Sequence, residues 1–204
     1  MIKHERALNI FKESVVKETL NDIPSGIRKS LGLHKEETIG SATETFTLLC
    51  DKAASMQQGG TLGDIVSIRF SFLRTEFARE KGIYSVDACD ERPFATKIPC
   101  FALWDAKYIF DPYFEIVRLW KTKGKKCELG IREVDVDGFA SEISVFPQFI
   151  ANVFLAGLAN TFGEHASYAV LSKTGDCTIT VGEYGGLQTT VYPVNQNEKR
   201  GETL

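Results

Sequence analysis

The segment DIVSIRFSFLR, at residues 64–74, contains the pattern that decides the fold class. Apolar and polar side chains alternate along it: Val66, Ile68, Phe70 and Phe72 are separated by Ser67, Arg69 and Ser71. Because successive side chains of a strand point to opposite faces of a sheet, this period of two predicts a half-buried strand. The segment IYSVDACD, at 83–90, predicts the returning strand after a turn at 79–82. Together they predict a hairpin near residues 64–90.

Helical periodicity marks the segments on either side of this hairpin, with apolar residues at steps of three and four. The predicted helices cover residues 4–22, 41–56, 111–122 and 148–162, with a shorter helical segment at 25–33. Two of these helices have specific start signals. Ser41 with Glu44 forms a capping box, and Asp111-Pro112 places an N-cap residue before a proline.

The C-terminal third returns to strand-like segments. SYAVLS (167–172), CTITVGEY (177–184) and LQTTVYPV (187–194) predict a three-stranded meander. Residues 173–176 would form its first turn, and Gly185-Gly186 a two-residue hairpin loop. Residues 195–204 are polar and are expected to be a flexible tail.

The order of the predicted elements does not alternate regularly between helix and strand. It therefore favours an α+β fold, with a mostly antiparallel sheet packed by about four helices, over a doubly wound parallel sheet. We expect a single globular domain over residues 1–194, with 1–60 as a helical, semi-separate N-terminal part, followed by the tail.

Composition limits the classes of function. The net charge of −3 gives no reason to expect binding to nucleic acid. The five cysteines, at 50, 89, 100, 127 and 177, include no Cys-x-x-Cys pair, so neither a disulfide framework nor a zinc site is expected. Reduced thiols and the lack of a signal peptide favour the cytoplasm. The longest apolar tract, 149–162, is shorter than the about 20 residues that span a bilayer, so no membrane segment is expected.

The aromatic segment 100–110, CFALWDAKYIF, has two possible conformations. As a strand it would place Asp105 and Lys107 side by side on one face. As a helix it would separate the two side chains around the helix axis. The aromatic content favours the strand, and Asp111-Pro112 already supplies a later helix start.

An acid-x-Lys pair on a strand, with another acid upstream, resembles the signature of restriction-endonuclease-like nucleases. This resemblance implies a metal-dependent phosphodiesterase in which Asp90 and Asp105 hold Mg²⁺ and Lys107 orients the attacking water. Acid-x-Lys triplets are no more frequent here than chance supplies, so this catalytic set of Asp90, Asp105 and Lys107 remains the alternative hypothesis.

The leading hypothesis is a non-catalytic interaction or assembly protein that binds a protein partner or itself. Neither a nucleotide-binding loop nor a set of residues with metal-ligand spacing is found in the sequence, and no cofactor is expected outside the Mg²⁺ alternative. An aromatic loop around Phe94, Ile98 and Phe101 is the candidate partner-binding patch. The threonine-rich hairpin 177–194 offers an edge strand to which a partner could add.

Overall fold

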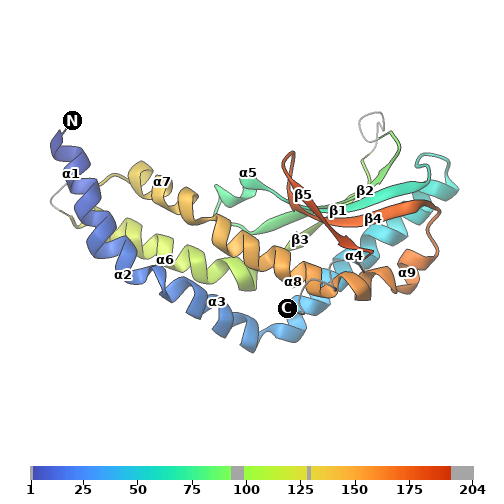
Figure 1. Ribbon diagram of the computed structural model, residues 1–204, viewed down its shortest axis with the longest axis horizontal. Coiled ribbons are helices and arrows are strands. Elements are labelled where there is room, and N and C mark those ends of the chain that lie inside the picture. Colours follow the sequence, from blue (N-terminus) through green and yellow to red (C-terminus); the bar gives the residue numbers. More distant parts are fainter. Residues whose placement is uncertain (1, 93–98, 128–129, 194–204) are drawn as a thin grey trace, which may run out of the picture. The chain divides into compact units, whose positions relative to one another are not determined.

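The computed structural model describes residues 2–92, 99–127 and 130–193 (Figure 1). The chain forms two compact units, each made from two separate stretches. We call residues 1–35 and 107–151 the helical unit, and residues 36–106 and 152–204 the sheet unit.

The expectation of one domain over 1–194 stays a prediction. Its suggested N-terminal part, 1–60, coincides with neither unit, because residues 36–60 belong to the sheet unit. The expected tail, 195–204, lies outside the described residues.

The helical unit is built from short helices with apolar inner faces. Its elements are α1 (Ile2–Phe11), the π-helix η1 (Lys12–Val16), α2 (Lys17–Leu20), α3 (Asp22–Leu33), α6 (Lys107–Lys125), α7 (Glu133–Ile143) and the first part of α8 (Val145–Gly163). Buried polar groups of α6 are paired with its neighbours. Trp120 Nε1 donates to Thr19 Oγ1 at 2.6 Å, and the Tyr113 hydroxyl donates to the Ala140 carbonyl at 2.5 Å. These bonds tie α6 to α2 and α7.

Helix α6 begins earlier than predicted. It starts at Lys107, so the expected strand over 100–110 is wrong beyond Asp105, and Pro112 lies inside the helix. The reason is burial at helical spacing: the buried residues of α6 are Ile109, Phe110, Tyr113, Phe114, Val117, Trp120 and Gly124. This stripe begins at Ile109, two residues before the Asp-Pro signal, and its burial outweighs that local start signal.

The sheet unit contains a five-stranded sheet in the order β3-β2-β1-β4-β5. The strands are β1 (Ile65–Phe72), β2 (Ile83–Asp90), β3 (Phe101–Asp105), β4 (Lys173–Glu183) and β5 (Gln188–Tyr192). The β1–β2, β2–β3 and β4–β5 pairs are antiparallel, and only β1–β4 is parallel. The predicted α+β class with a mostly antiparallel sheet is therefore confirmed, and so is the hairpin of 64–90.

The helices of this unit are α4 (Lys35–Gln58), α5 (Arg74–Phe77), the second part of α8, and α9 (Ala166–Ala169). Helix α4 and the end of α8 run along one side of the sheet (Figure 1). Aromatic rings join them to it: the Phe46 ring of α4 lies 4.6 Å from the Phe162 ring of α8, and the Phe70 ring of β1 lies 5.3 Å from Phe162. All three side chains are fully buried.

A register shift near the start of β1 changes the predicted apolar face. Ile65 and Ile68 are both completely buried, whereas Val66, expected on the apolar face, is only half-buried. The pairing with β2 and with β4 shifts between Ile65 and Ser67. Such a bulge adds one residue to the strand, so the alternation restarts after it and both isoleucines reach the core.

The C-terminal meander has two strands, not three. The expected strand 167–172 contains the short helix α9, where His165 Nδ1 accepts a hydrogen bond from the Ser167 N–H at 3.3 Å. The expected turn 173–176 is the start of β4, because Lys173 pairs with Ile65. Two helices also differ from the prediction. Helix α4 begins at Lys35 and not at the predicted Ser41, and the sequence analysis did not predict α7.

One helical stretch, Glu133–Gly163, is long and apolar enough to cross a membrane. It exceeds the predicted tract 149–162 because α7 and α8 follow one another with a single turn residue between them. Length and composition alone do not make this stretch a membrane span, since the core helices of soluble proteins can be equally long and apolar. The absence of a membrane segment stays a prediction.

Two glycines of α8 give a matched pair of variants. A Cβ at Gly163 would collide with the Tyr192 ring of β5, whereas a Cβ at Gly157 would meet nothing within 4 Å. We expect Gly163→Ala to destabilise the protein by about 1–3 kcal/mol through overpacking. Gly157→Ala should stabilise it by about 0.5–1 kcal/mol through helix propensity. Chemical denaturation measures both, and equal effects would contradict the packing of α8 against β5.

Candidate functional site

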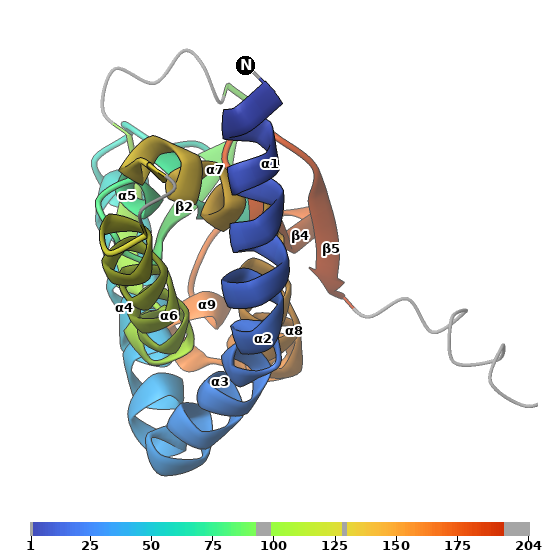
Figure 2. The same ribbon diagram turned by 90° about the vertical axis from the view of Figure 1, so that its left-hand side faces the viewer.

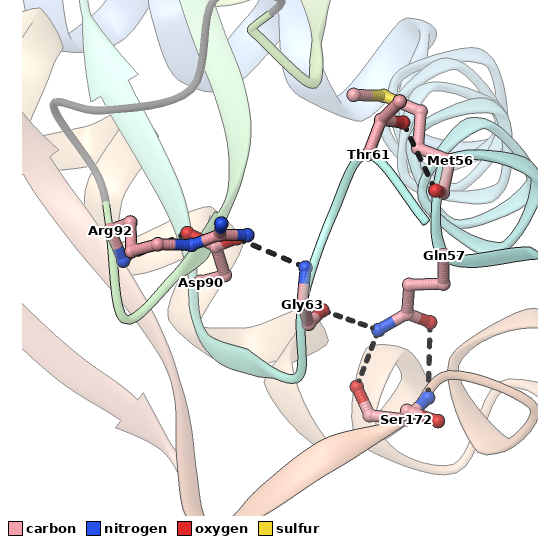
Figure 3. A network of polar contacts seen from close by, with 7 residues as sticks. All are labelled: Met56, Gln57, Thr61, Gly63, Asp90, Arg92 and Ser172. Carbon is pink, nitrogen blue, oxygen red and sulfur yellow. Dashed lines mark hydrogen bonds and ion pairs between the residues drawn. The ribbon is translucent and has the colours of Figure 1, made fainter. Parts of the chain in front are cut away.

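Asp90, one of the three predicted catalytic residues, ends β2 and is 2% exposed. Its carboxylate accepts hydrogen bonds from the Gly63 N–H at 3.0 Å and the Arg92 N–H at 2.9 Å, and it forms an ion pair with the Arg92 guanidinium at 3.0 Å (Figure 3). Burial alone would raise the pKa of Asp90, but these bonds outweigh it and hold the pKa below its usual value. Asp90 therefore joins the segment before β1 to the end of β2.

Gln57 secures the other side of the same segment. Its side-chain amide donates to the carbonyls of Gly63 and Ser172, both at 2.8 Å, and its Oε1 accepts from the Ser172 N–H at 3.1 Å (Figure 3). The sequence analysis does not single out Gln57, which lies just beyond the predicted helix 41–56 and in the last turn of α4. Both polar residues thus fix the backbone around Gly63.

The structure does not bring the predicted catalytic residues together. Asp105 ends β3 and pairs with Ile83, which is seven residues before Asp90 on β2, or roughly 23 Å along the strand. Lys107 begins α6 and belongs to the helical unit. Within residues 2–92, 99–127 and 130–193, no group of three or more His, Cys, Asp or Glu side chains could hold a metal ion. The phosphodiesterase hypothesis gains no support from this arrangement.

Only part of the predicted partner-binding patch can be located. Phe94 and Ile98 lie outside the described residues, and Phe101 lies in β3 with 39% of its surface exposed. The Lys52 ammonium lies 5.0 Å from the centre of the Phe101 ring, and it donates to the Phe101 carbonyl at 3.3 Å. Phe101 is therefore in contact with a lysine of α4.

Strand β3 forms one edge of the sheet, and Lys52 protects it. The Ala88 N–H donates to the Cys100 carbonyl, so the ladder bonds fall on even-numbered residues of β3 and the backbone groups of Phe101 and Leu103 face outward. Lys52 already occupies one of these outward carbonyls. A lysine at a sheet edge is a common device against pairing with another chain.

Strand β5 forms the other edge, beyond β4 (Figure 2). The Glu183 N–H donates to the Leu187 carbonyl, so Val181 and Thr189 form the next hydrogen-bonded pair and the backbone groups of Thr190 face outward. The sequence of β5, QTTVY, contains no charge and no proline. Within the described residues, no lysine is bound to an outward carbonyl of β5 as Lys52 of α4 is bound to that of Phe101, although the β4–β5 pairing has a bulge between Ile179 and Thr180 and Pro193 follows the strand.

The face of the sheet opposite Phe70 carries polar side chains, and we call it the polar face. Its members are Ser67, Arg69 and Ser71 of β1, Ser85, Asp87 and Cys89 of β2, and Thr178 and Thr180 of β4. A hollow of about 320 Å³ lies over this face. Leu62, Asp90 and Pro99 line one end, and the hairpin loop Tyr184–Gly186 lines the other. This volume falls at the lower limit of typical small-molecule sites.

Gln188 forms part of the wall of the hollow. Its side-chain amide donates to Ser71 Oγ at 3.3 Å, and its Oε1 accepts from Thr180 Oγ1 at 3.2 Å. The same Nε2 also donates to the Glu183 carbonyl at 2.9 Å, and this third bond holds the Gln188 side chain to the β4–β5 hairpin. The hairpin is thereby fixed beside the polar face.

Arg69 and Asp87 face each other across β1 and β2 but are not joined by an ion pair in the described part of the chain. Arg69 Nε donates to Ser67 Oγ at 3.1 Å, whereas Asp87 Oδ1 accepts from Ser85 Oγ at 3.0 Å. Since the strands are antiparallel, these serines lie on opposite sides of the Arg69–Asp87 pair. The two charged groups therefore lean toward opposite ends of the hollow.

The titrating groups of the hollow are affected mainly by burial. Burial raises the pKa of Asp87, although the Ser85 hydrogen bond and the charge of Arg69 act in the opposite direction. Burial also raises the pKa of the Cys89 thiol, again opposed by Arg69. A thiol with a raised pKa is a poor nucleophile at neutral pH, so Cys89 is not an activated nucleophile.

The sequence contained the signal for this site. The alternation that predicts β1 places Ser67, Arg69 and Ser71 together on the polar face of a half-buried strand, but it does not predict a binding site there. The hollow depends on the parallel pairing of β1 with β4 and on the hairpin loop beside them, which periodicity does not predict. No family model, curated protein or solved structure matches the chain.

Asp90 gives a test of the structural role described above. Asp90→Asn replaces an acceptor by an amide and should destabilise the protein by about 1–3 kcal/mol at pH 7. Because the folded pKa of Asp90 is lowered, the stabilisation by its carboxylate exists above the unfolded pKa and is lost as the pH falls below about 4.

The free energy of unfolding, measured by denaturation from pH 7 down to pH 3, should therefore differ most between wild type and Asp90→Asn at neutral pH. The exposed Asp64→Asn serves as the control and should leave stability at pH 7 unchanged. A difference between wild type and Asp90→Asn that stays constant over the whole pH range would contradict this role.

Proposed function

We propose that the protein is a non-catalytic assembly protein that pairs with a second copy of itself through the edge strand β5. The observation that supports this proposal is the difference between the two sheet edges. The outward carbonyl of Phe101 on β3 is bound by Lys52, whereas β5 has outward backbone groups at Thr190 and no charged residue. Unprotected edges of this kind are templates for strand addition.

The composition of β5 suits pairing with an identical strand. An antiparallel pair related by a two-fold axis through Thr190 would place Thr190 opposite its own copy and Thr189 opposite Val191. Threonine–threonine and threonine–valine neighbours are favourable across strands, and no like charges would meet. The resulting sheet would continue through both copies and leave no β5 edge exposed.

Two further features fit an assembly protein of the cytoplasm. All five cysteines are free, as expected in a reducing compartment. The hydroxyl side chains of Thr189 and Thr190 are exposed, so pairing would require little rearrangement of β5. We do not propose phosphodiesterase activity, because Asp90 lies at the end of β2, whereas Asp105 of β3 pairs with Ile83 at the start of β2.

Two substitutions at Thr190 separate backbone pairing from side-chain effects. Thr190→Pro removes the outward N–H but keeps the ladder to β4, since proline is tolerated at sheet edges where its nitrogen faces away. Thr190→Val keeps that N–H and a β-branched side chain. We expect a concentration-dependent dimer for wild type and Thr190→Val, and a monomer for Thr190→Pro, measured by analytical ultracentrifugation with folding checked by circular dichroism.

A wild-type protein that stays monomeric up to high micromolar concentration would contradict the proposal. So would a folded Thr190→Pro variant that dimerises as strongly as Thr190→Val, because pairing would then not use the outward N–H of β5.

A further inference from the structure

The hollow over the polar face has two oppositely charged ends. Arg69 leans toward Ser67 and Cys89, and Asp87 leans toward Ser85 and Ser71. Within the described residues, the terminal nitrogens of Arg69 and Oδ2 of Asp87 have no hydrogen-bond partner. Each end can therefore accept one further charged group.

The separation of the two ends follows from strand geometry. Each charged side chain is bound to a serine two residues away on its own strand, and the two directions are opposite. Ser67 and Ser85 lie four residue positions apart along the sheet, which is about 13 Å. Because Arg69 Nε lies 3.1 Å from Ser67 Oγ and Asp87 Oδ1 lies 3.0 Å from Ser85 Oγ, the two charged groups are separated by roughly 7 Å along the strands, and ligand charges that meet them would lie about that far apart.

We propose that the hollow binds a small linear zwitterion, with its carboxylate on Arg69 and its ammonium group on Asp87. A linear ω-amino acid of six carbons, or a dipeptide, has charges at about this separation. The guanidinium fork can hold a carboxylate with two hydrogen bonds, and charge-assisted bonds of this kind are stronger than neutral ones. The proposal does not depend on β5 pairing, because Arg69 and Asp87 lie on the central strands of the sheet.

The remaining lining of the hollow suits the uncharged middle and ends of such a ligand. Leu62, Asp90 and Pro99 line the Arg69 end, and the Asp90 carboxylate there is already bound by the Gly63 N–H and by Arg92. Gly185 and Gly186 have no side chains to fill the opposite end. Because Arg69 and Asp87 are not joined to each other by an ion pair in the described part of the chain, a ligand that supplies both opposite charges has no such pair to break.

The test measures binding of 6-aminohexanoate by isothermal titration calorimetry. We expect it to bind at least about tenfold more tightly than hexanoate or hexylamine, which each lack one charge, and than glycine, whose charges are too close together. Arg69→Gln and Asp87→Asn should each weaken binding by about tenfold or more. Lys81→Gln and Asp51→Asn change the net charge equally at exposed residues of the sheet unit that do not line the hollow, and these variants should bind like wild type.

Cys89 provides a second measurement at the same place. In a Cys127→Ser background, where the three other cysteines are buried, 6-aminohexanoate should slow alkylation of Cys89, and hexylamine should not. The proposal is overturned if 6-aminohexanoate binds no better than its single-charge analogues. It is also overturned if Arg69→Gln and Asp87→Asn, shown to be folded, bind as wild type does, or if Cys89 is alkylated at the same rate with saturating ligand.

Discussion

The packing of Phe70 with Phe46 and Phe162 determines which side of the sheet is closed. Phe70 lies at the middle of β1, the central strand, and the three rings are fully buried between the sheet and helices α4 and α8. Since side chains alternate along a strand, burying Phe70 on this side requires Arg69 and Ser71 to lie on the other side. A shift of one residue would bury an arginine, which explains why the register is so strongly specified.

The two proposed activities both follow from this constraint. The polar face exists because β1 and β2 place their polar residues on one side, and Arg69 and Asp87 become directly opposed through the antiparallel register. The β5 edge exists because β5 is the last strand of the sheet order, although its Tyr192 ring lies 6.3 Å from the Tyr168 ring of α9. The closed face thus supplies the core packing, whereas the polar face and the β5 edge are the surfaces on which the two proposals rest.

Periodicity predicted the parts of the fold where a single pattern dominates. Strand 83–90 and the hairpin of 64–90 are confirmed, as is the α+β class, because beyond the bulge at the start of β1 the apolar side chains of Ile68, Phe70 and Phe72 share the buried face that the alternation predicts. The prediction is wrong where a local signal competes with burial. Asp111-Pro112 predicts a helix start, but α6 begins earlier because Ile109 and Phe110 are buried as part of it. The sequence also could not reveal the β1–β4 pairing, which joins residues more than one hundred positions apart. The polar hollow depends on that pairing, so the sequence could indicate its individual polar residues but not that they lie around one hollow.

The stability of two variants at adjacent positions tests the closed and polar faces most directly. Phe70→Ala leaves a cavity among buried rings and should reduce the free energy of unfolding by about 3–5 kcal/mol. Arg69→Ala, one residue away on the polar face, should reduce it by less than about 1 kcal/mol. Equilibrium denaturation of both variants measures the difference. Similar losses for the two, or a larger loss for Arg69→Ala, would contradict the assignment of the faces on which the account rests.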